Sequence, residues 1–186
     1  MGGPADVRGV GIEGALLLGL PTHTDGRGSL SEVFRRAWVP GAREVVQANL
    51  SVSRPGVLRG LHFHRRQADY WCFLAGPAFV GLYDLRRGSP TEGRKAELLL
   101  DPAEGLRALY LPPGVAHGFY AVGEVRLLYL VDAYFTGEDE HGLAWDDPAV
   151  GISWPSREPV LSDRDREGPP LAEARAAAPS WRGSPG

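Results

Sequence analysis

The chain of 186 residues is long enough for one domain with a sizeable hydrophobic core. Its 25 glycines and 16 prolines make up more than a fifth of the chain, against roughly 12% in average usage. Because 43% of the residues are also hydrophobic, the composition argues against a disordered chain or a helical bundle and favours short strands joined by tight turns. The formal net charge of −3 argues against nucleic acid as a partner.

The charged and sulfur-containing residues indicate which side chains bind anions and in which cellular compartment the protein works. Lys95 is the only lysine, so arginine guanidinium groups are the expected anion binders. Cys72 is the only cysteine and cannot form an internal disulfide, which fits a reducing compartment. The apolar stretch over residues 15–18 is too short for a signal peptide or a membrane span. We therefore expect a soluble, cytoplasmic protein with no membrane partner.

The predicted elements are short strands that follow a Gly-rich and loosely structured start over residues 1–12. Turn signals such as Gly76-Pro77 and Asp101-Pro102 separate these strands. Roughly ten strands at 8–12-residue spacing predict a sandwich or a barrel. The strands are predicted over residues 15–20, 29–34, 44–53, 57–64, 70–74, 78–84, 95–100, 106–111, 119–122 and 125–134.

About the last 50 residues differ in character from the strands before them. Trp145 and Trp154 lie in Pro- and Asp-containing segments and are expected to anchor packed loops. Residues 171–178 have a helix-forming composition. Residues 179–186 are mostly Pro, Gly and Ser and are expected to be disordered.

Two histidines lie close together in the predicted strand over residues 57–64. Residues two apart face the same side of a strand, so His62 and His64 point one way and Leu61 and Phe63 the other. Surface histidines or hydrogen-bonded core histidines are the alternative. Two of them on one strand face favour a functional site.

Three further segments hold candidate residues whose local sequence allows a plain structural role. His117 follows a Pro-Pro-Gly turn, an arrangement that also fits a hairpin with an incidental histidine. Tyr129 is the polar-tipped residue in an apolar run, where a tyrosine usually belongs to the core. The charged segment over residues 161–165 by itself indicates a solvated surface.

Seven motifs occur in chain order: Asp25-x-Arg27-Gly28, Gln47-x-Asn49, Gly56-Val57-Leu58-Arg59-Gly60-Leu61-His62-Phe63, Asp84-Leu85-Arg86-x-Gly88-Ser89-Pro90-Thr91, Pro113-Gly114-x-Ala116-His117-Gly118-Phe119, Trp145-x-Asp147-Pro148 and Leu161-Ser162-x-x-Asp165. In this order they resemble the dTDP-4-dehydrorhamnose 3,5-epimerases, the RmlC-type cupins of deoxysugar biosynthesis.

The resemblance implies an all-β fold, a cupin-type double-stranded β-helix (jelly roll) with short peripheral helices. It places this domain over residues 13–172 and leaves a partly disordered tail over residues 173–186. It further implies a homodimer that binds a nucleotide-linked sugar and needs no cofactor. The implied reaction is an isomerisation: epimerisation at C3 and C5 of dTDP-4-dehydro-6-deoxyglucose, which gives dTDP-4-dehydrorhamnose for dTDP-rhamnose biosynthesis.

Such an epimerisation needs a base, a stabiliser for the enolate oxygen and an acid on the opposite face of the sugar. By resemblance His62 is the base and Asp165 holds its imidazole. Tyr129 falls on the position of the acid, and a phenol that titrates near pH 10 stays protonated and able to donate. The residues implied to contact the substrate are Arg27, Glu32, Gln47, Asn49, Arg59, His117 and Glu140.

Two positions depart from the family pattern. Asp69 stands where the family has a lysine that helps to stabilise the enolate, and His64 replaces a family glutamine. An anionic carboxylate cannot stabilise an enolate directly. Either another cation takes that role, or the reaction differs.

The same departures create a second pattern, since His62, His64, Asp69 and His117 match the metal-binding motif of cupins with Asp in place of Glu. Three imidazoles and a carboxylate suit zinc, iron, manganese or nickel, and a metal there would act as a Lewis acid. A histidine bound to a metal cannot also be a free base, so the two roles of His62 exclude each other. We favour the assignment without a metal.

Other functions remain open. A related sugar-nucleotide cupin reaction, 3-epimerisation alone or ketoisomerisation, would use a similar site. A non-catalytic sugar-binding cupin is the alternative of a different class. The presence of a base, its carboxylate partner and an acid argues against binding alone, which does not require all three.

Overall fold

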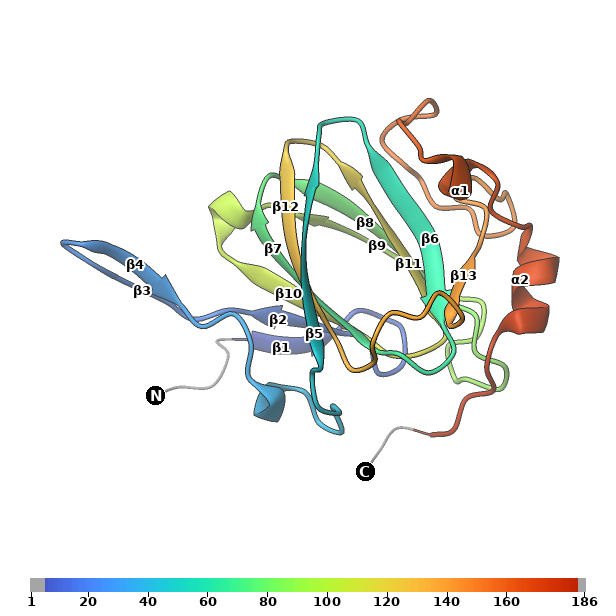
Figure 1. Cartoon of the computed structure of the whole chain (residues 1–186), viewed down its shortest axis with the longest axis horizontal. Helices are drawn as coiled ribbons and strands as arrows, with labels where there is room; N and C mark the ends of the chain where they lie inside the picture. Colours follow the sequence, from blue (N-terminus) through green and yellow to red (C-terminus); the bar gives the residue numbers. More distant parts are fainter. Residues whose placement is uncertain (1–5, 184–186) are drawn as a thin grey trace.

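The computed structural model of the chain describes residues 6–183, which form two antiparallel sheets facing each other (Figure 1). One sheet has six strands in the order β1 (Asp6–Gly9), β2 (Leu16–Gly19), β10 (Arg107–Leu111), β7 (Asp69–Ala75), β12 (Val125–Val131) and β5 (Gln47–Ser53). The other has five, in the order β13 (Glu140–Gly142), β6 (Leu58–His64), β11 (Val115–Ala121), β8 (Ala78–Asp84) and β9 (Lys95–Leu100). From β5 to β8, and again from β9 to β13, successive strands alternate between the two sheets. The predicted all-β jelly roll is confirmed.

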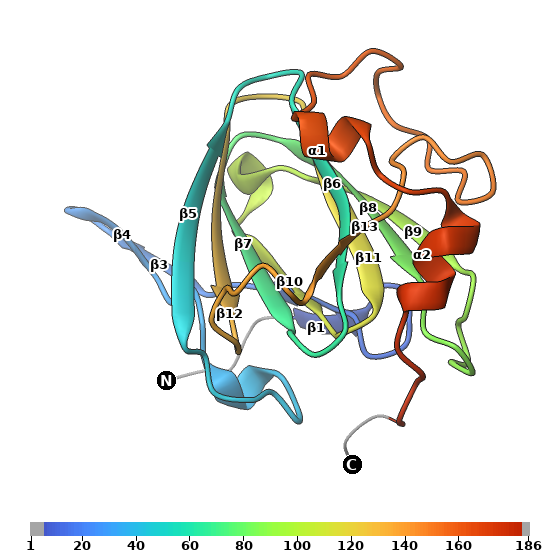
Figure 2. The same cartoon turned by 45° about the vertical axis from the view of Figure 1, so that its right-hand side comes forward.

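The short helices lie outside this barrel. The 3-10 turns are η1 (Arg36–Trp38) and η2 (Pro102–Glu104), and the α-helices are α1 (Asp163–Arg166) and α2 (Leu171–Ala177). Figure 2 shows α1 beside the end of β6 and α2 on the outer side of the five-stranded sheet. There Leu171 and Ala174 of α2 pack with Leu61 and Phe63 of β6. No helix among residues 6–183 has the length and apolar character to cross a membrane.

Because side chains alternate along the strands, apolar residues fill one part of the space between the two sheets. Trp71 and Phe73 of β7 pack edge-to-face against Phe119 of β11, with ring centroids 5.8 and 6.0 Å apart. Each of these strands continues into a polar residue on the same inner face, Asp69 on β7 and His117 on β11. The core therefore ends in a polar cavity rather than filling the barrel.

A buried ion pair closes the loop after β8. Arg86 donates from Nε and Nη2 to the two carboxylate oxygens of Asp84, both at 2.8 Å, and Ser89 and Thr91 donate to the same carboxylate. Arg86 also donates to the carbonyl of Glu13. This motif thus ties the loop to the N-terminal segment, at a distance from the polar cavity.

Several elements differ from the sequence expectations. Residues 6–9, expected to be loose, form β1 because their backbone pairs with β2. The strand predicted over residues 29–34 ends at Ser31 in β4 (Gly28–Ser31), which forms a hairpin with β3 (Thr22–Asp25). The strand predicted from residue 119 begins at Val115.

The C-terminal segment also departs from expectation in part. The boundary expected after residue 172 falls inside α2, which packs on the five-stranded sheet. Ser180 of the expected tail makes a β-bridge to Arg87, while residues 184–186 lie outside the described residues. The indole of Trp154 donates to the carbonyl of Trp145 at 2.7 Å, as expected for packed loops.

Candidate active site

The polar cavity has a volume of about 430 Å³ and lies between the two sheets. Its walls come from β5, β6, β7, β11, β12, β13 and α1. It gathers eight of the residues predicted from the sequence: Gln47, Asn49, Arg59, His62, His117, Tyr129, Glu140 and Asp165. Residues that are more than 100 positions apart in the chain therefore meet around one space.

His62 is held by a carboxylate that comes from α1. Its Nε2 lies 2.6 Å from Oδ1 of Asp165, and Ser162, the N-cap of α1, donates from Oγ to the other oxygen of Asp165 at 2.8 Å. Burial opposes ionisation of Asp165, but the hydrogen bonds from His62 and Ser162 hold its pKa below the ordinary value. The local sequence of residues 161–165 indicated a solvated surface. The structure differs, because Asp165 of this segment is only 7% exposed.

The ionised partner decides which nitrogen of His62 carries a lone pair. A carboxylate only accepts hydrogen bonds, so Nε2 carries the proton and Nδ1 is free in the neutral ring. Nδ1 lies 3.7 Å from Oε1 of Glu140, whose other oxygen pairs with Arg164 at 2.7 Å. Although burial opposes ionisation of Glu140, the hydrogen bond from Arg164 lowers its pKa. The basic atom of His62 is therefore Nδ1.

A β-bulge in β6 brings Arg59 to the same cavity as His62. Between the pairs His117–His62 and Phe119–Arg59, β6 has one residue more than β11. Strict alternation would have placed Arg59 and His62 on opposite faces of the strand. Within the bulge, a Cβ at Gly60, whose φ is +123°, would lie 2.7 Å from Cα of Gly118. Only glycine permits this approach of β6 to β11.

Tyr129 stands on the other sheet, across the cavity from His62. It lies on β12, paired with Asn49 of β5 on one side and Trp71 of β7 on the other. Burial and the negative charges of Asp69 and Glu140 raise its pKa. Its hydroxyl therefore keeps its proton at neutral pH, as a general acid requires.

The remaining predicted contact residues lie in two places. Gln47 donates from Nε2 to Oδ1 of Asn49 at 3.0 Å on β5, at the rim of the cavity. Arg27 and Glu32 lie outside the cavity, on and directly after the hairpin that projects from the barrel (Figure 1). Of the Arg27 side chain 91% is exposed, and its partner is Asp25 of the same hairpin.

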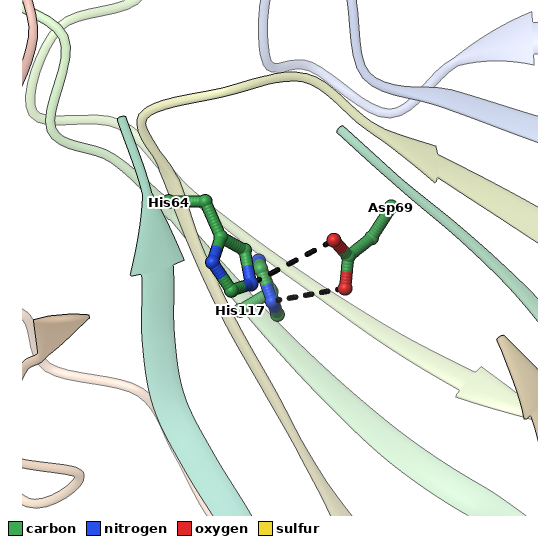
Figure 3. A group of neighbouring side chains, drawn as sticks. All are labelled: His64, Asp69 and His117. Carbon is green, nitrogen blue, oxygen red and sulfur yellow. Dashed lines mark ion pairs between the residues drawn. The ribbon is translucent and has the colours of Figure 1, made fainter. Parts of the chain in front are cut away.

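The four residues of the metal-binding pattern do not form one cluster. His64, Asp69 and His117 point toward one another (Figure 3), whereas His62 turns to Asp165. Burial lowers the pKa of His117 to about 4, against the opposing effect of Asp69. Gln67, Arg164 and Ser162 also line the cavity and were not predicted from the sequence to do so. Only Ser162 carried a signal, the Ser-x-x-Asp spacing of a helix N-cap.

Comparison with known proteins agrees with the motifs. Residues 10–173 match the sequence profile of the family described as dTDP-4-dehydrorhamnose 3,5-epimerase. The chain belongs to this family. A family member from Streptomyces niveus named dTDP-4-dehydrorhamnose 3-epimerase is 40% identical over 92% of this chain and 86% of its own length.

Two further relatives are similar along most of this chain. A dTDP-4-dehydrorhamnose 3,5-epimerase from Neisseria gonorrhoeae is 37% identical over 93% of this chain, which spans about half (55%) of that relative. The crystal structure of dTDP-6-deoxy-D-glucose-3,5-epimerase from Legionella pneumophila, in complex with dTDP-4-keto-L-rhamnose, has a TM-score of 0.86 and 29% identity, covering 96% of this chain and 99% of that chain. These similarities agree with the cupin-type fold.

Proposed function

We propose that the protein epimerises C3 and C5 of dTDP-4-dehydro-6-deoxyglucose and so produces dTDP-4-dehydrorhamnose for dTDP-rhamnose biosynthesis. The observation that carries this proposal is the placement of His62, held by Asp165, on one sheet and of Tyr129 on the other, around one cavity. Membership of the family and the sugar nucleotide in the Legionella relative support the same substrate class.

The proposed chemistry uses the two walls of the cavity. Hydrogens next to a ketone are weakly acidic, and Nδ1 of His62 removes one of them from one face of the sugar. Tyr129 donates its phenolic proton to the same carbon from the opposite face, which inverts that centre. The side chains of Gln47, Asn49 and Glu140 line the same space and bind the substrate.

Stabilisation of the enolate requires positive charge or hydrogen-bond donors. Among the described residues that line the cavity, the basic side chains with permanent charge are Arg59 and Arg164. Arg164 is paired with Glu140, whereas Arg59 donates from Nε to a neutral partner, Ser53, at 2.9 Å. We therefore assign the cationic role among the side chains to Arg59.

We further propose a homodimer in which the hairpin of each chain reaches the cavity of its partner. Arg27 lies on the hairpin that projects from the barrel and Glu32 directly follows it, and neither lines the cavity of its own chain, which supports contact with the substrate of a partner. Apolar side chains on the hairpin and on the edge strand β5 support an interface, since Leu30 is 73% exposed and Leu50 63% exposed. A cytoplasmic location is part of the proposal and is supported by the unpaired, buried thiol of Cys72.

A second candidate is epimerisation at C3 alone, favoured by the name of the Streptomyces niveus relative. Incubation with dTDP-4-dehydro-6-deoxyglucose in heavy water, with deuterium located by NMR, separates the two. We expect deuterium at C3 and C5 together with dTDP-4-dehydrorhamnose as the product. Deuterium at C3 alone selects the 3-epimerase, and incorporation at neither carbon rejects both.

A further inference from the structure

Three buried side chains from three strands converge inside the cavity (Figure 3). They are His64 at the end of β6, Asp69 at the start of β7 and His117 in β11. Nε2 of His64 lies 3.7 Å from Oδ1 of Asp69, and Nε2 of His117 lies 3.8 Å from Oδ2. All the potential ligand atoms lie within 4.8 Å of one another.

The backbone fixes the tautomer of both imidazoles. Nδ1 of His117 donates to the carbonyl of Val115 at 2.9 Å, and Nδ1 of His64 donates to the carbonyl of Asp139 at 3.1 Å. A carbonyl only accepts, so both Nδ1 atoms carry protons and both Nε2 atoms keep their lone pairs. Metal-binding histidines typically donate their second nitrogen in this way.

The carboxylate of Asp69 is also oriented by its neighbours. The indole of Trp71 donates to Oδ2 at 3.2 Å, and the amide of Gln67 donates to Oδ1 at 2.8 Å. Ligating carboxylates are commonly held by such outer hydrogen bonds. Hydrogen bonds from neighbouring groups therefore orient the Nε2 atoms of His64 and His117 and the carboxylate of Asp69 toward one another.

A hydrogen-bonded network without an ion is the competing explanation. Gln67 Nε2 lies 3.2 Å from Nε2 of His64 and could bridge it to Asp69. It does not account for His117, because none of the described residues donates a hydrogen bond to its Nε2. Nε2 of His117 and Oδ2 of Asp69 lie 3.8 Å apart at the cavity wall, and a cation bound between them would interact favourably with both.

We propose that His64, Asp69 and His117 bind one divalent transition-metal ion in the substrate cavity. Two imidazole nitrogens and one carboxylate oxygen suit Zn²⁺, Mn²⁺, Fe²⁺, Co²⁺ or Ni²⁺. Three protein ligands leave coordination positions free, as in catalytic sites. The site does not include His62, so a bound ion and a free base can coexist in the same cavity.

The ion has a role that rests on the proposed epimerase function. Lys95, the only lysine, lies on β9 outside the cavity, so among the described residues that line it the side chain assigned to the enolate is Arg59. An ion bound here supplies Lewis-acid charge beside the substrate. The ligands Asp69 and His117 line the same cavity as Tyr129 and His62.

Binding is tested without substrate. Untagged protein stripped with a chelator is titrated with Zn²⁺ by calorimetry, and we expect one ion per chain. His64→Gln and Asp69→Asn should each weaken binding by roughly 100-fold or more, beyond the loss typical of outer-shell changes. His23→Gln, which removes an exposed histidine from β3, should leave it unchanged. Gln67→Ala removes only a hydrogen bond to Asp69 and should weaken binding less than either ligand variant. Absence of saturable binding, or unchanged binding in both ligand variants, would overturn the proposal.

A measurement on the wild-type chain avoids variants that fail to fold. The chain has five histidines, and addition of Zn²⁺ should shift the Nε2 resonances of two, His64 and His117, in ¹⁵N NMR spectra. Coordination by His62, or no coordination shift, contradicts the assigned ligand set.

The role of the ion is tested separately by deuterium exchange in stripped and reloaded protein. Loss of exchange on stripping, with recovery on reloading, supports the role; equal rates overturn it. Protein that binds the ion but exchanges neither carbon contradicts the proposed function and not the metal site.

Discussion

Nε2 of His62 lies 2.6 Å from Oδ1 of Asp165, a residue 103 positions later in the chain. The carboxylate sits in the first turn of a four-residue helix whose N-cap, Ser162, binds it as well. Helix capping and orientation of the base are therefore coupled, because one short element does both. The proton on Nε2 leaves Nδ1 as the basic atom, and the predictions about catalysis follow from that arrangement.

Replacement of Asp165 by Asn should lower the rate of exchange by at least ~10-fold with little change in KM, since an amide no longer fixes the tautomer of His62. Steady-state kinetics measure the two parameters. Asp163→Asn is the matched control from the same helix, because the Asp163 side chain is 94% exposed. Equal losses in both variants would show that α1 matters only for stability.

His62→Ala should abolish deuterium exchange at both carbons while leaving the fold intact, because the half-buried ring contributes little to core packing. Mass spectrometry measures exchange, and circular dichroism checks the fold. His141→Ala, which removes a ring stacked on Phe63 rather than one in the cavity, should retain exchange. Near-normal exchange in His62→Ala contradicts the assignment of the base.

Tyr129→Phe should reduce formation of inverted product by roughly 10²–10⁴-fold, the usual contribution of a general acid. Proton abstraction survives, so exchange at one carbon persists. NMR in heavy water follows both events in one sample. Tyr134→Phe, at a tyrosine that is 71% exposed, serves as the control. A parallel fall of exchange and inversion would place Tyr129 in substrate binding instead.

Asp84→Asn should destabilise the protein by about 3–5 kcal/mol, because it leaves the buried guanidinium of Arg86 uncompensated. Urea unfolding measures the change. Burial opposes ionisation of Asp84, but hydrogen bonds from Arg86, Ser89 and Thr91 hold its pKa below the ordinary 3.8. A carboxyl with a depressed pKa stabilises the fold above the unfolded value and loses that effect as the pH falls. The difference between wild type and variant should therefore shrink below pH 3.8.

The hairpin offers a matched control for that variant. Asp25 and Arg27 have the same Asp-x-Arg spacing and a similar pairing, with Nη2 and Oδ2 2.6 Å apart, but both are exposed. Asp25→Asn should change stability far less, because solvent screens exposed pairs. Equal effects would mean that burial does not decide the strength of the Asp84 pair.

Mixed dimers test whether the site is shared between chains. Arg27→Ala and His62→Ala should each be poorly active alone, whereas co-expressed chains should regain activity, because each mixed dimer has one intact cavity served by an intact hairpin. Light scattering checks that the dimer forms. No recovery in a verified mixed dimer would place Arg27 in the cavity of its own chain or outside the site.

Local patterns in the sequence determined much of the architecture. Alternation on β6 correctly predicted that His62 and His64 face one side and Leu61 and Phe63 the other. Spacing of Gly and Pro located most of the strands, because turns depend on the residues within them. β1 was missed, since residues 6–9 are exposed and owe their strand conformation to pairing with β2.

The tertiary structure alone decided how the candidate residues are grouped. The metal-binding pattern grouped His62 with His64, Asp69 and His117, whereas the family resemblance paired it with Asp165. The approach of α1 gives His62 the second of these surroundings. The bulge at Gly60 turned Arg59 into the cavity, against simple alternation. Side-chain direction along one strand is local and has a fixed period, so a sequence reveals it. Which strands and helices meet depends on the packing of the whole barrel. That packing separates the base His62 from His64, a proposed metal ligand only two residues later in the chain.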